Sequence, residues 1–189
     1  MKAIKFLLML VTPLLFHSAF AQDASFGLKG GLNIATIGGD AEGVSSKAGI
    51  HFGAFSRMEV SESLIFQPEL IYSMQGSALD GTGDPKANYS YLNIPMIFRI
   101  YPNNEGFHIH AGPQIGFLLS GEISAADVDI DVKNQLNSID FALGLGMGYD
   151  INNIILDARY NLGINSSAED DTEGSFPLRT LQLSIGFIF

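Results

Sequence analysis

The sequence predicts an all-β fold, an eight-stranded antiparallel up-and-down transmembrane β-barrel. Three observations carry the prediction: segments in which apolar and polar residues alternate, connections that alternate between short and long, and aromatic residues near segment ends. Strict alternation indicates strands with two different faces. Short turns at one end and long loops at the other are typical of barrels in bacterial outer membranes.

The first residues predict a secretory signal peptide. Two lysines precede a short apolar run, and Ala19-Phe20-Ala21 then forms a small-residue cleavage pattern. The run is too short for a membrane anchor, so we expect cleavage after Ala21. The predicted domains are therefore the signal peptide, 1–21, and the barrel, 22–189.

The chain is acidic and lacks cysteine. Its formal net charge is −10, and loss of Lys2 and Lys5 with the signal peptide makes it −12. This excess of negative charge argues against nucleic acid as a partner. The missing cysteines exclude disulfides, cysteine metal sites and thiol chemistry.

Eight alternating segments follow the signal peptide. In order they are 25–37, 47–59, 63–76, 89–101, 107–120, 137–149, 154–164 and 178–189. Each has at least the ~9–11 residues that a tilted strand needs to cross a bilayer. The short connections 60–62, 102–106 and 150–153 predict tight hairpins. The other four connections are long, polar and acidic.

One face of every segment is apolar and the other is polar. The apolar face is built from Leu, Ile, Phe, Met and Tyr over five or six successive positions. The polar face holds Lys29, Asn33, His51, Arg57, Gln67, Glu69, Asn93, Arg99, His108, His110, Gln114, Asp140, Asp157, Arg159, Asn161 and Gln182. In a membrane barrel the apolar face meets lipid and the polar face lines the lumen. A secreted lipocalin-like barrel, with the faces exchanged, is the alternative.

Aromatic residues near the segment ends predict two membrane girdles. Those expected at the short-turn end are Tyr101, Phe107, Tyr149, Phe187 and Phe189. Those expected toward the other end are Tyr72, Tyr89, Phe117 and Tyr160. The chain also ends on Phe189 after an alternating strand, which resembles the C-terminal signal read by the outer-membrane assembly machinery.

Three central segments contain a proline, which has no N–H to give to a ladder. The alternation places Pro68 and Pro113 on the lipid face and Pro95 on the lumenal face. We expect each at a bulge or a missing ladder bond, and this sector of the wall to be the most irregular.

The lumen of an eight-stranded barrel is filled by side chains, which disfavours an open pore. Buried charges need partners, so we expect a paired lumenal charge network. Its predicted members are Lys29, Arg57, Glu69, Arg99, Asp140, Asp157 and Arg159, with Arg179 as a further inward cation. The alternative interpretation of these charges is a narrow proton or ion path.

His108 and His110 are the only candidates for a metal site, since strand spacing places both imidazoles on one face. Hydrogen bonding within the lumen is the favoured interpretation of these histidines, so no metal ligand, cofactor or catalytic residue is assigned. Asp127-Val128-Asp129-Ile130-Asp131 departs from the calcium-loop template and predicts a strand-like extension of the hairpin instead. Glu169-Asp170-Asp171 predicts a solvated acidic tip.

Five runs resemble the PorT-like small outer-membrane β-barrel family of Bacteroidota, the outer membrane protein beta-barrel domain. They are GLKGGLNIATI (27–37), LIFQPELIYSMQG (64–76), YLNIPMIFRIY (91–101), AGPQIGFLLSG (111–121) and LDARYNLGI (156–164). Asn93 departs from the glutamate that is common in the family. The resemblance implies a structural barrel with an accessory role in protein secretion, and it implies no catalytic residues.

The sequence therefore predicts a non-enzymatic barrel in a Gram-negative outer membrane, with a structural or partner-interaction role and periplasmic termini. A small transport or ligand-binding barrel and an outer-membrane lipid-modifying enzyme are the alternatives. The expected partners are outer-membrane lipid and lipopolysaccharide, the assembly machinery through Phe189, and other proteins.

Overall fold

The computed structural model describes residues 24–37, 44–79, 86–103, 105–125, 128–133, 136–165 and 177–189. The predicted signal peptide, Asp127 and the acidic run Glu169–Asp171 lie outside these residues. No helix in the described part of the chain is long and apolar enough to cross a membrane.

Nine strands make up the described fold. They are β1 (Ala24–Ile37), β2 (Val44–Ser61), β3 (Leu64–Leu79), β4 (Lys86–Ile100), β5 (Phe107–Ala125), β6 (Val128–Asp131), β7 (Ile139–Ile151), β8 (Ile154–Gly163) and β9 (Leu178–Ile188). Eight of them form the wall, in the order β4-β3-β2-β1-β9-β8-β7-β5, and the pairing of β4 with β5 closes it. All the pairings are antiparallel, so the predicted eight-stranded barrel is confirmed.

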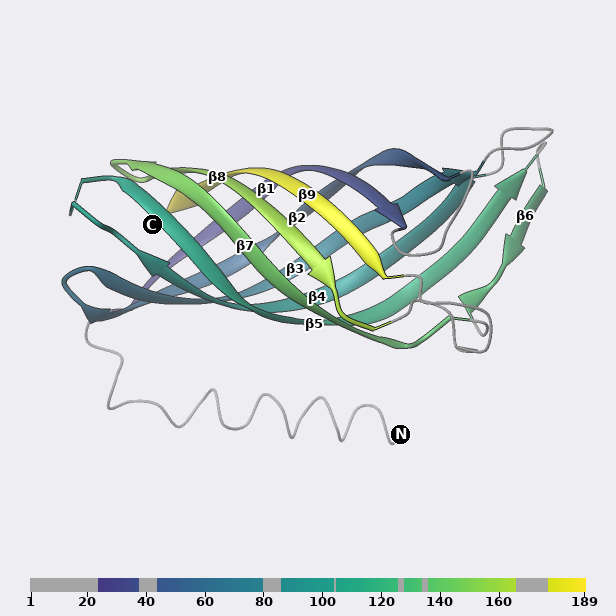
Figure 1. Ribbon diagram of the computed structural model, residues 1–189. Helices are drawn as coiled ribbons and strands as arrows, with labels where there is room; N and C mark the ends of the chain where they lie inside the picture. The colour runs from purple at the N-terminus through teal and green to yellow at the C-terminus, as the bar shows by residue number, and fades with distance from the viewer. Residues whose placement is uncertain are drawn as a thin grey trace.

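The two ends of the barrel differ (Figure 1). At one end, the turn end, short connections join β2 to β3, β4 to β5 and β7 to β8. The C-terminus lies at this end, where the N–H of Phe189 donates to the carbonyl of Phe26 at 2.9 Å. The opposite end, the loop end, carries the longer connections.

The apolar face of the wall points outward and the polar face points inward. The large outward residues of β1 are exposed, for example Leu28 at 55% and Leu32 at 58%. All sixteen residues predicted for the polar face are buried. A belt of exposed Leu, Ile and Phe around a charged interior fits a hydrocarbon surrounding, and it excludes the lipocalin-like alternative.

The wall is taller on one side than the sequence predicts. Strands β2 to β5 extend into the predicted loops, and β5 reaches 19 residues against 10 in β8. Beyond the wall, β6 pairs with the end of β5, with Ile130 opposite Ile123 (Figure 1). This short strand confirms the predicted extension of the hairpin within residues 128–131.

The prolines coincide with gaps in the ladders. Between β3 and β4 the pairing is interrupted from Pro68–Met96 to Ile71–Asn93, with the same register on both sides. The β4–β5 ladder is interrupted between Pro95–Gln114 and Phe98–Ala111, which includes Pro113. Each proline therefore lies at an interruption of a ladder, as expected, and none lies at a bulge. Register shifts occur instead in the β2–β3 ladder and near Tyr91, while the remaining wall ladders are continuous.

Three side chains point in the direction opposite to the predicted one. Tyr89 and Tyr101 were expected in the girdles but are buried inside the barrel. They lie at odd-numbered positions around β4, in phase with the inward Asn93 and Arg99. Arg179 was expected inside but is exposed, because it shares its strand face with the outward Leu183.

Two neighbouring glycines test how tightly the wall is paired. A Cβ at Gly31 would lie 1.9 Å from the carbonyl oxygen of Leu183, whereas a Cβ at Gly30 would come no nearer than 3.4 Å to its closest neighbour. We expect Gly31→Ala to lower the free energy of unfolding by about 1–3 kcal/mol, because the β1–β9 backbone must move. Urea titration in detergent measures this. Gly30→Ala is the matched control, and an equal loss in both variants would contradict the prediction.

Candidate functional site

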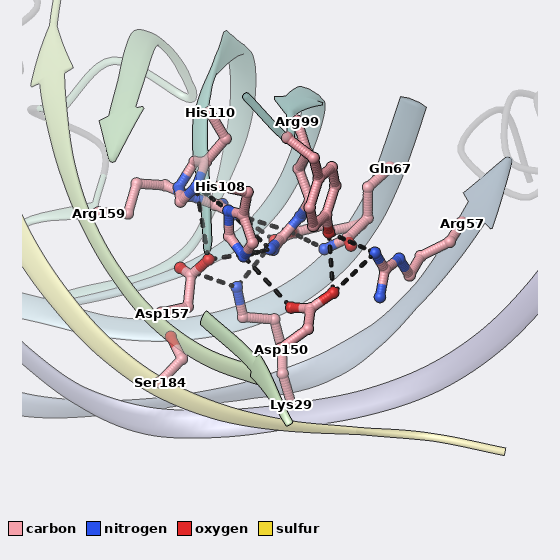
Figure 2. A network of polar contacts seen from close by, with 12 residues as sticks. Lys29, Arg57, Gln67, Arg99, His108, His110, Asp150, Asp157, Arg159 and Ser184 are labelled. Carbon is pink, nitrogen blue, oxygen red and sulfur yellow. Dashed lines mark hydrogen bonds and ion pairs between the residues drawn. The ribbon is translucent and has the colours of Figure 1, made fainter. Parts of the chain in front are cut away.

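The candidate site is the network of charged side chains inside the wall (Figure 2). Its residues come from inward positions on β1, β2, β3, β4, β5, β7 and β8, where successive side chains alternate between the two faces. Closing the sheet brings these strands around one narrow space. Residues far apart in the sequence therefore make direct contact, for example Glu69 and Arg159, which are 90 positions apart.

Arg159 and Glu69 form the centre of the network. The guanidinium of Arg159 donates to both carboxylate oxygens of Glu69, at 2.7 Å and 2.9 Å, in a two-point contact across the lumen. Lys29 Nζ lies 3.4 Å from Glu69 Oε2, and Gln67 donates to Glu69 Oε1 at 2.8 Å. A planar guanidinium matches a carboxylate in this geometry, which makes the pair strong and directional.

Asp157 is the second carboxylate that binds more than one cation. Its Oδ2 accepts from Arg99 Nη2 at 3.0 Å, and its Oδ1 lies 3.7 Å from Lys29 Nζ. Lys29 thus links Asp157 to Glu69. The Asp157 and Arg99 side chains are both 1% exposed, so these charges interact in a medium of low dielectric.

His108 and His110 lie against the arginines. Arg99 Nη1 donates to His108 Nε2 at 2.7 Å, and Arg159 Nε donates to His110 Nε2 at 3.4 Å. A ring nitrogen that accepts from a guanidinium is unprotonated, so both imidazoles act as neutral links. The adjacent positive charges oppose a metal ion. Among the described residues, no group of three or more His, Cys, Asp or Glu side chains is placed to hold one.

A second cluster closes the turn end of the lumen. Asp150 Oδ2 lies 2.9 Å from Arg57 Nη2 and accepts from the Tyr101 hydroxyl at 2.8 Å. Arg57 also donates to that hydroxyl, and Asp150 Oδ1 lies 3.3 Å from His108 Nε2. Tyr101 follows the last residue of β4, and burial raises the pKa of its phenol to about 12. The hydroxyl therefore remains a hydrogen-bond donor at neutral pH.

Sequence reasoning missed Asp150 and Tyr101 as members of this cluster. Asp150 was assigned to a turn, and Tyr101 to a girdle. A signal was present, since Asp150 continues the even-numbered inward phase of Asp140 along β7. Asp140 itself is buried but forms no ion pair with any described residue, and its Oδ1 has no hydrogen-bond partner. Asp140 was predicted to belong to the charge network, but it does not contact the other charged residues of that network.

A layer of neutral polar side chains lies beside the charges, nearer the loop end. His51 bonds to Asn33 Oδ1 and to Ser184 Oγ, both at 2.8 Å. Asn33 also contacts Ser73 at 3.0 Å and Gln182 at 3.2 Å. These bonds cross between strands and fill the space around the barrel axis.

The lumen is closed at the level of the charges. The gap lined by Lys29, Gln67, Arg99 and Asp157 is too small to admit a water molecule. Long side chains from opposite strands meet there, and each makes several polar contacts. No continuous aqueous channel passes this level of the described barrel.

Fold and lumen together define an integral outer-membrane β-barrel protein: an apolar belt, a closed eight-stranded wall and a charged, filled interior. Residues 20–169 match the outer membrane protein beta-barrel domain, and the chain belongs to that family. No curated protein sequence matches it.

Solved outer-membrane proteins share the fold. Neisserial surface protein A (NspA) is 15% identical, with a TM-score of 0.58 over 88% of this chain and 98% of its own. Ail, the attachment invasion locus protein of Yersinia pestis, is 14% identical, with a TM-score of 0.55 over 89% of this chain and 100% of its own. OprG from Pseudomonas aeruginosa is 14% identical, with a TM-score of 0.50 over 88% and 96%. At these identities the similarity concerns the fold alone.

Removing Arg159 tests the central pair. Arg159→Ala leaves the buried Glu69 with Lys29 as its remaining ion-pair partner, so we expect a loss of about 3–5 kcal/mol in the free energy of unfolding. Arg179→Ala, which removes the same side chain from the exposed face of β9, is the control and should have no measurable effect. Urea titration in detergent measures both. Equal midpoints would show that the network contributes nothing to stability.

Proposed function

We propose that this protein is a non-enzymatic outer-membrane barrel that does not conduct and that presents its loop end to partners. The observation that carries the proposal is the Arg159–Glu69 pair, whose side chains are at most 1% exposed and meet across the lumen. A transport route along the axis would have to break this pair and the contacts around it. The loop end, which carries the long connections, is then the part of the molecule that we assign to partner contact.

The orientation follows from general features of such barrels. Outer-membrane barrels have short periplasmic turns and longer outer loops. The turn end would accordingly face the periplasm, with both chain termini there after cleavage of the signal peptide following Ala21. The exposed Phe187 and Phe189 at this end support contact with the assembly machinery and then with lipid.

The acidic loops favour a basic partner surface. The long connections contain most of the acidic residues outside the lumen, and the chain has a formal net charge of −10. Ail was solved with sucrose octasulfate, a heparin analogue, which is a polyanion. Negative loops would repel such a ligand, so we do not extend this binding to the present chain. A protein partner is the better match, and the resemblance to PorT-like barrels of Bacteroidota suggests a role beside the secretion machinery.

Planar-bilayer recordings test the closed lumen. We expect the purified barrel to show no steady conductance, because the gap at the charge network excludes water. Arg179→Ala, outside the lumen, should behave identically. A steady, ion-selective conductance in the wild-type protein would refute the proposal.

Affinity capture from native membranes tests the partner role. We expect the wild-type chain to retain at least one membrane or secretion protein, with retention that falls as salt rises, since the loops are charged. Replacing Glu169, Asp170 and Asp171 by their amides should weaken this capture. A deletion strain that secretes all its cargo normally would count against the secretion role. Partners outside secretion would still be detected by the capture experiment.

A further inference from the structure

A groove runs over the outer face of the wall, on the side where β1, β9, β8 and β7 lie next to one another (Figure 1). Its volume is about 600 Å³, and its outward lining side chains are apolar apart from one tyrosine hydroxyl. These side chains form two neighbouring rows across the ladders. One row is Gly30, Ile185, Leu156, Tyr149 and Phe107, and the other is Leu32, Leu183, Ala158 and Met147. The groove therefore belongs to the lipid-facing surface and is separate from the lumen.

Two small residues open the groove. Gly30 and Ala158 stand where the other outward positions of the two rows hold Leu, Ile, Met, Phe or Tyr. The wall does not require a glycine at position 30, because its φ is not positive and an added Cβ would come no nearer than 3.4 Å to its closest neighbour. A glycine inside a strand weakens the strand and often marks the close approach of a ligand. The space over Gly30 is thus left free for a molecule outside the wall.

The groove begins at the turn end and finishes near the middle of the wall. Phe107 is the first residue of β5, at the turn end, whereas Gly30 lies in the middle of β1. The five strands that line the groove span four inter-strand spacings, or about 19 Å. Because the ladders of a barrel are inclined to its axis, this span rises by about 12 Å along the axis. The hydrocarbon of one membrane leaflet is about 15 Å thick, so the groove and a leaflet match in height.

These features fit one lipid acyl chain better than a protein. An acyl chain would enter beside Phe107 and Tyr149, at the level of the aromatic girdle, and end near Gly30 at the middle of the bilayer. A second copy of this chain would not fill the groove. A two-fold interface sets the same surface against itself, so two facing grooves would enclose an empty space between the copies.

The turns beside the groove indicate which head group accompanies the chain. The short connections 62–63, 101–106 and 152–153 contain no lysine or arginine, which an anionic head group would need as partners. Glu105, two residues before β5, is exposed and attracts an ammonium group. The Tyr149 hydroxyl at the same end can donate to a phosphate or ester oxygen. This combination favours a head group that carries an ammonium beside its phosphate.

We propose that this groove is a binding site for one phospholipid, whose acyl chain lies along the two rows and whose head group carries an ammonium. Burial of the methylene groups against the apolar side chains supplies the affinity. The assignment to the periplasmic leaflet rests on the orientation proposed above, whereas the contact between chain and groove does not. Lipid binding tests the groove, and conductance and affinity capture test the role of the barrel, so either proposal can fail without the other.

Lipid retention in detergent micelles separates a binding site from the general contact between the belt and lipid. The full barrel is incubated with equal amounts of phosphatidylethanolamine and phosphatidylglycerol, and native mass spectrometry counts the lipids that remain attached. We expect saturation at one phosphatidylethanolamine per barrel. Equal retention of phosphatidylglycerol, or a count that rises with added lipid without saturating, would overturn the proposal.

A photoreactive lipid locates the acyl chain. With a phosphatidylethanolamine that carries a diazirine midway along one chain, we expect the label on Met147 and Leu183, which line the groove. Leu70 and Phe98 are similarly exposed on the β3–β4 side of the belt, and their labelling should be at least about threefold weaker. An even distribution over the four residues would overturn the proposal.

Filling the groove tests its two small residues. Ala158→Leu should weaken the retention of phosphatidylethanolamine at least about tenfold, because the larger side chain takes the space of the acyl chain. Ala54→Leu makes the same change at an exposed alanine of β2, outside the groove, and should leave retention unchanged. Equal retention in the wild-type protein and in Ala158→Leu would overturn the proposal.

Heat-modifiable migration in gels verifies that each variant is folded. If Ala158→Leu does not fold, Gly30→Leu takes its place, since the wall leaves room for a Cβ at Gly30. Undiminished retention in Gly30→Leu would then overturn the proposal, and a loss of retention would support it.

Discussion

The pairing of β1 with β9 is the constraint on which the rest of the structure depends. It joins the first and last strands in a continuous ladder from Gly27–Ile188 to Ile37–Leu178. Within a bilayer, unpaired backbone groups have no water to bind, so only a closed sheet is stable there. Closure also separates two surroundings, lipid outside and a narrow polar space inside. Every buried charge described above depends on that separation.

Inside the closed wall, ion pairs connect strands on opposite sides of the barrel. Glu69 on β3 meets Arg159 on β8, Arg99 on β4 meets Asp157 on β8, and Lys29 on β1 reaches both carboxylates. These contacts connect strands that share no ladder. Breaking one leaves an uncompensated charge, which is why such a network favours a single arrangement of the wall over its alternatives.

The alternation of residue types was sufficient to predict the strands, their phases and the polar lining. The predicted direction was wrong for three side chains, although the inward–outward alternation along their strands gave the right one. Residue type was given more weight than this alternation. Tyr89 and Tyr101 were therefore assigned to the girdles, and Arg179 to the lumen. Which charges pair could not be predicted, because Glu69 and Arg159 meet only through the tilt and register of strands far apart in sequence. Strand ends were also underestimated, since polar residues of β2 to β5 pair well beyond the apolar belt.

The unequal height of the wall makes one side of the barrel different from the opposite side. At about 3.4 Å per residue, the 19 residues of β5 measure about 65 Å, against about 34 Å for the 10 residues of β8. At the loop end the β7–β9 side is therefore lower than the β3–β5 side, which forms a ridge (Figure 1). A large molecule that approaches the loop end along the barrel axis meets the ridge first, on one defined side of the barrel. A barrel whose strands all ended at the same height would not distinguish one side from another in this way.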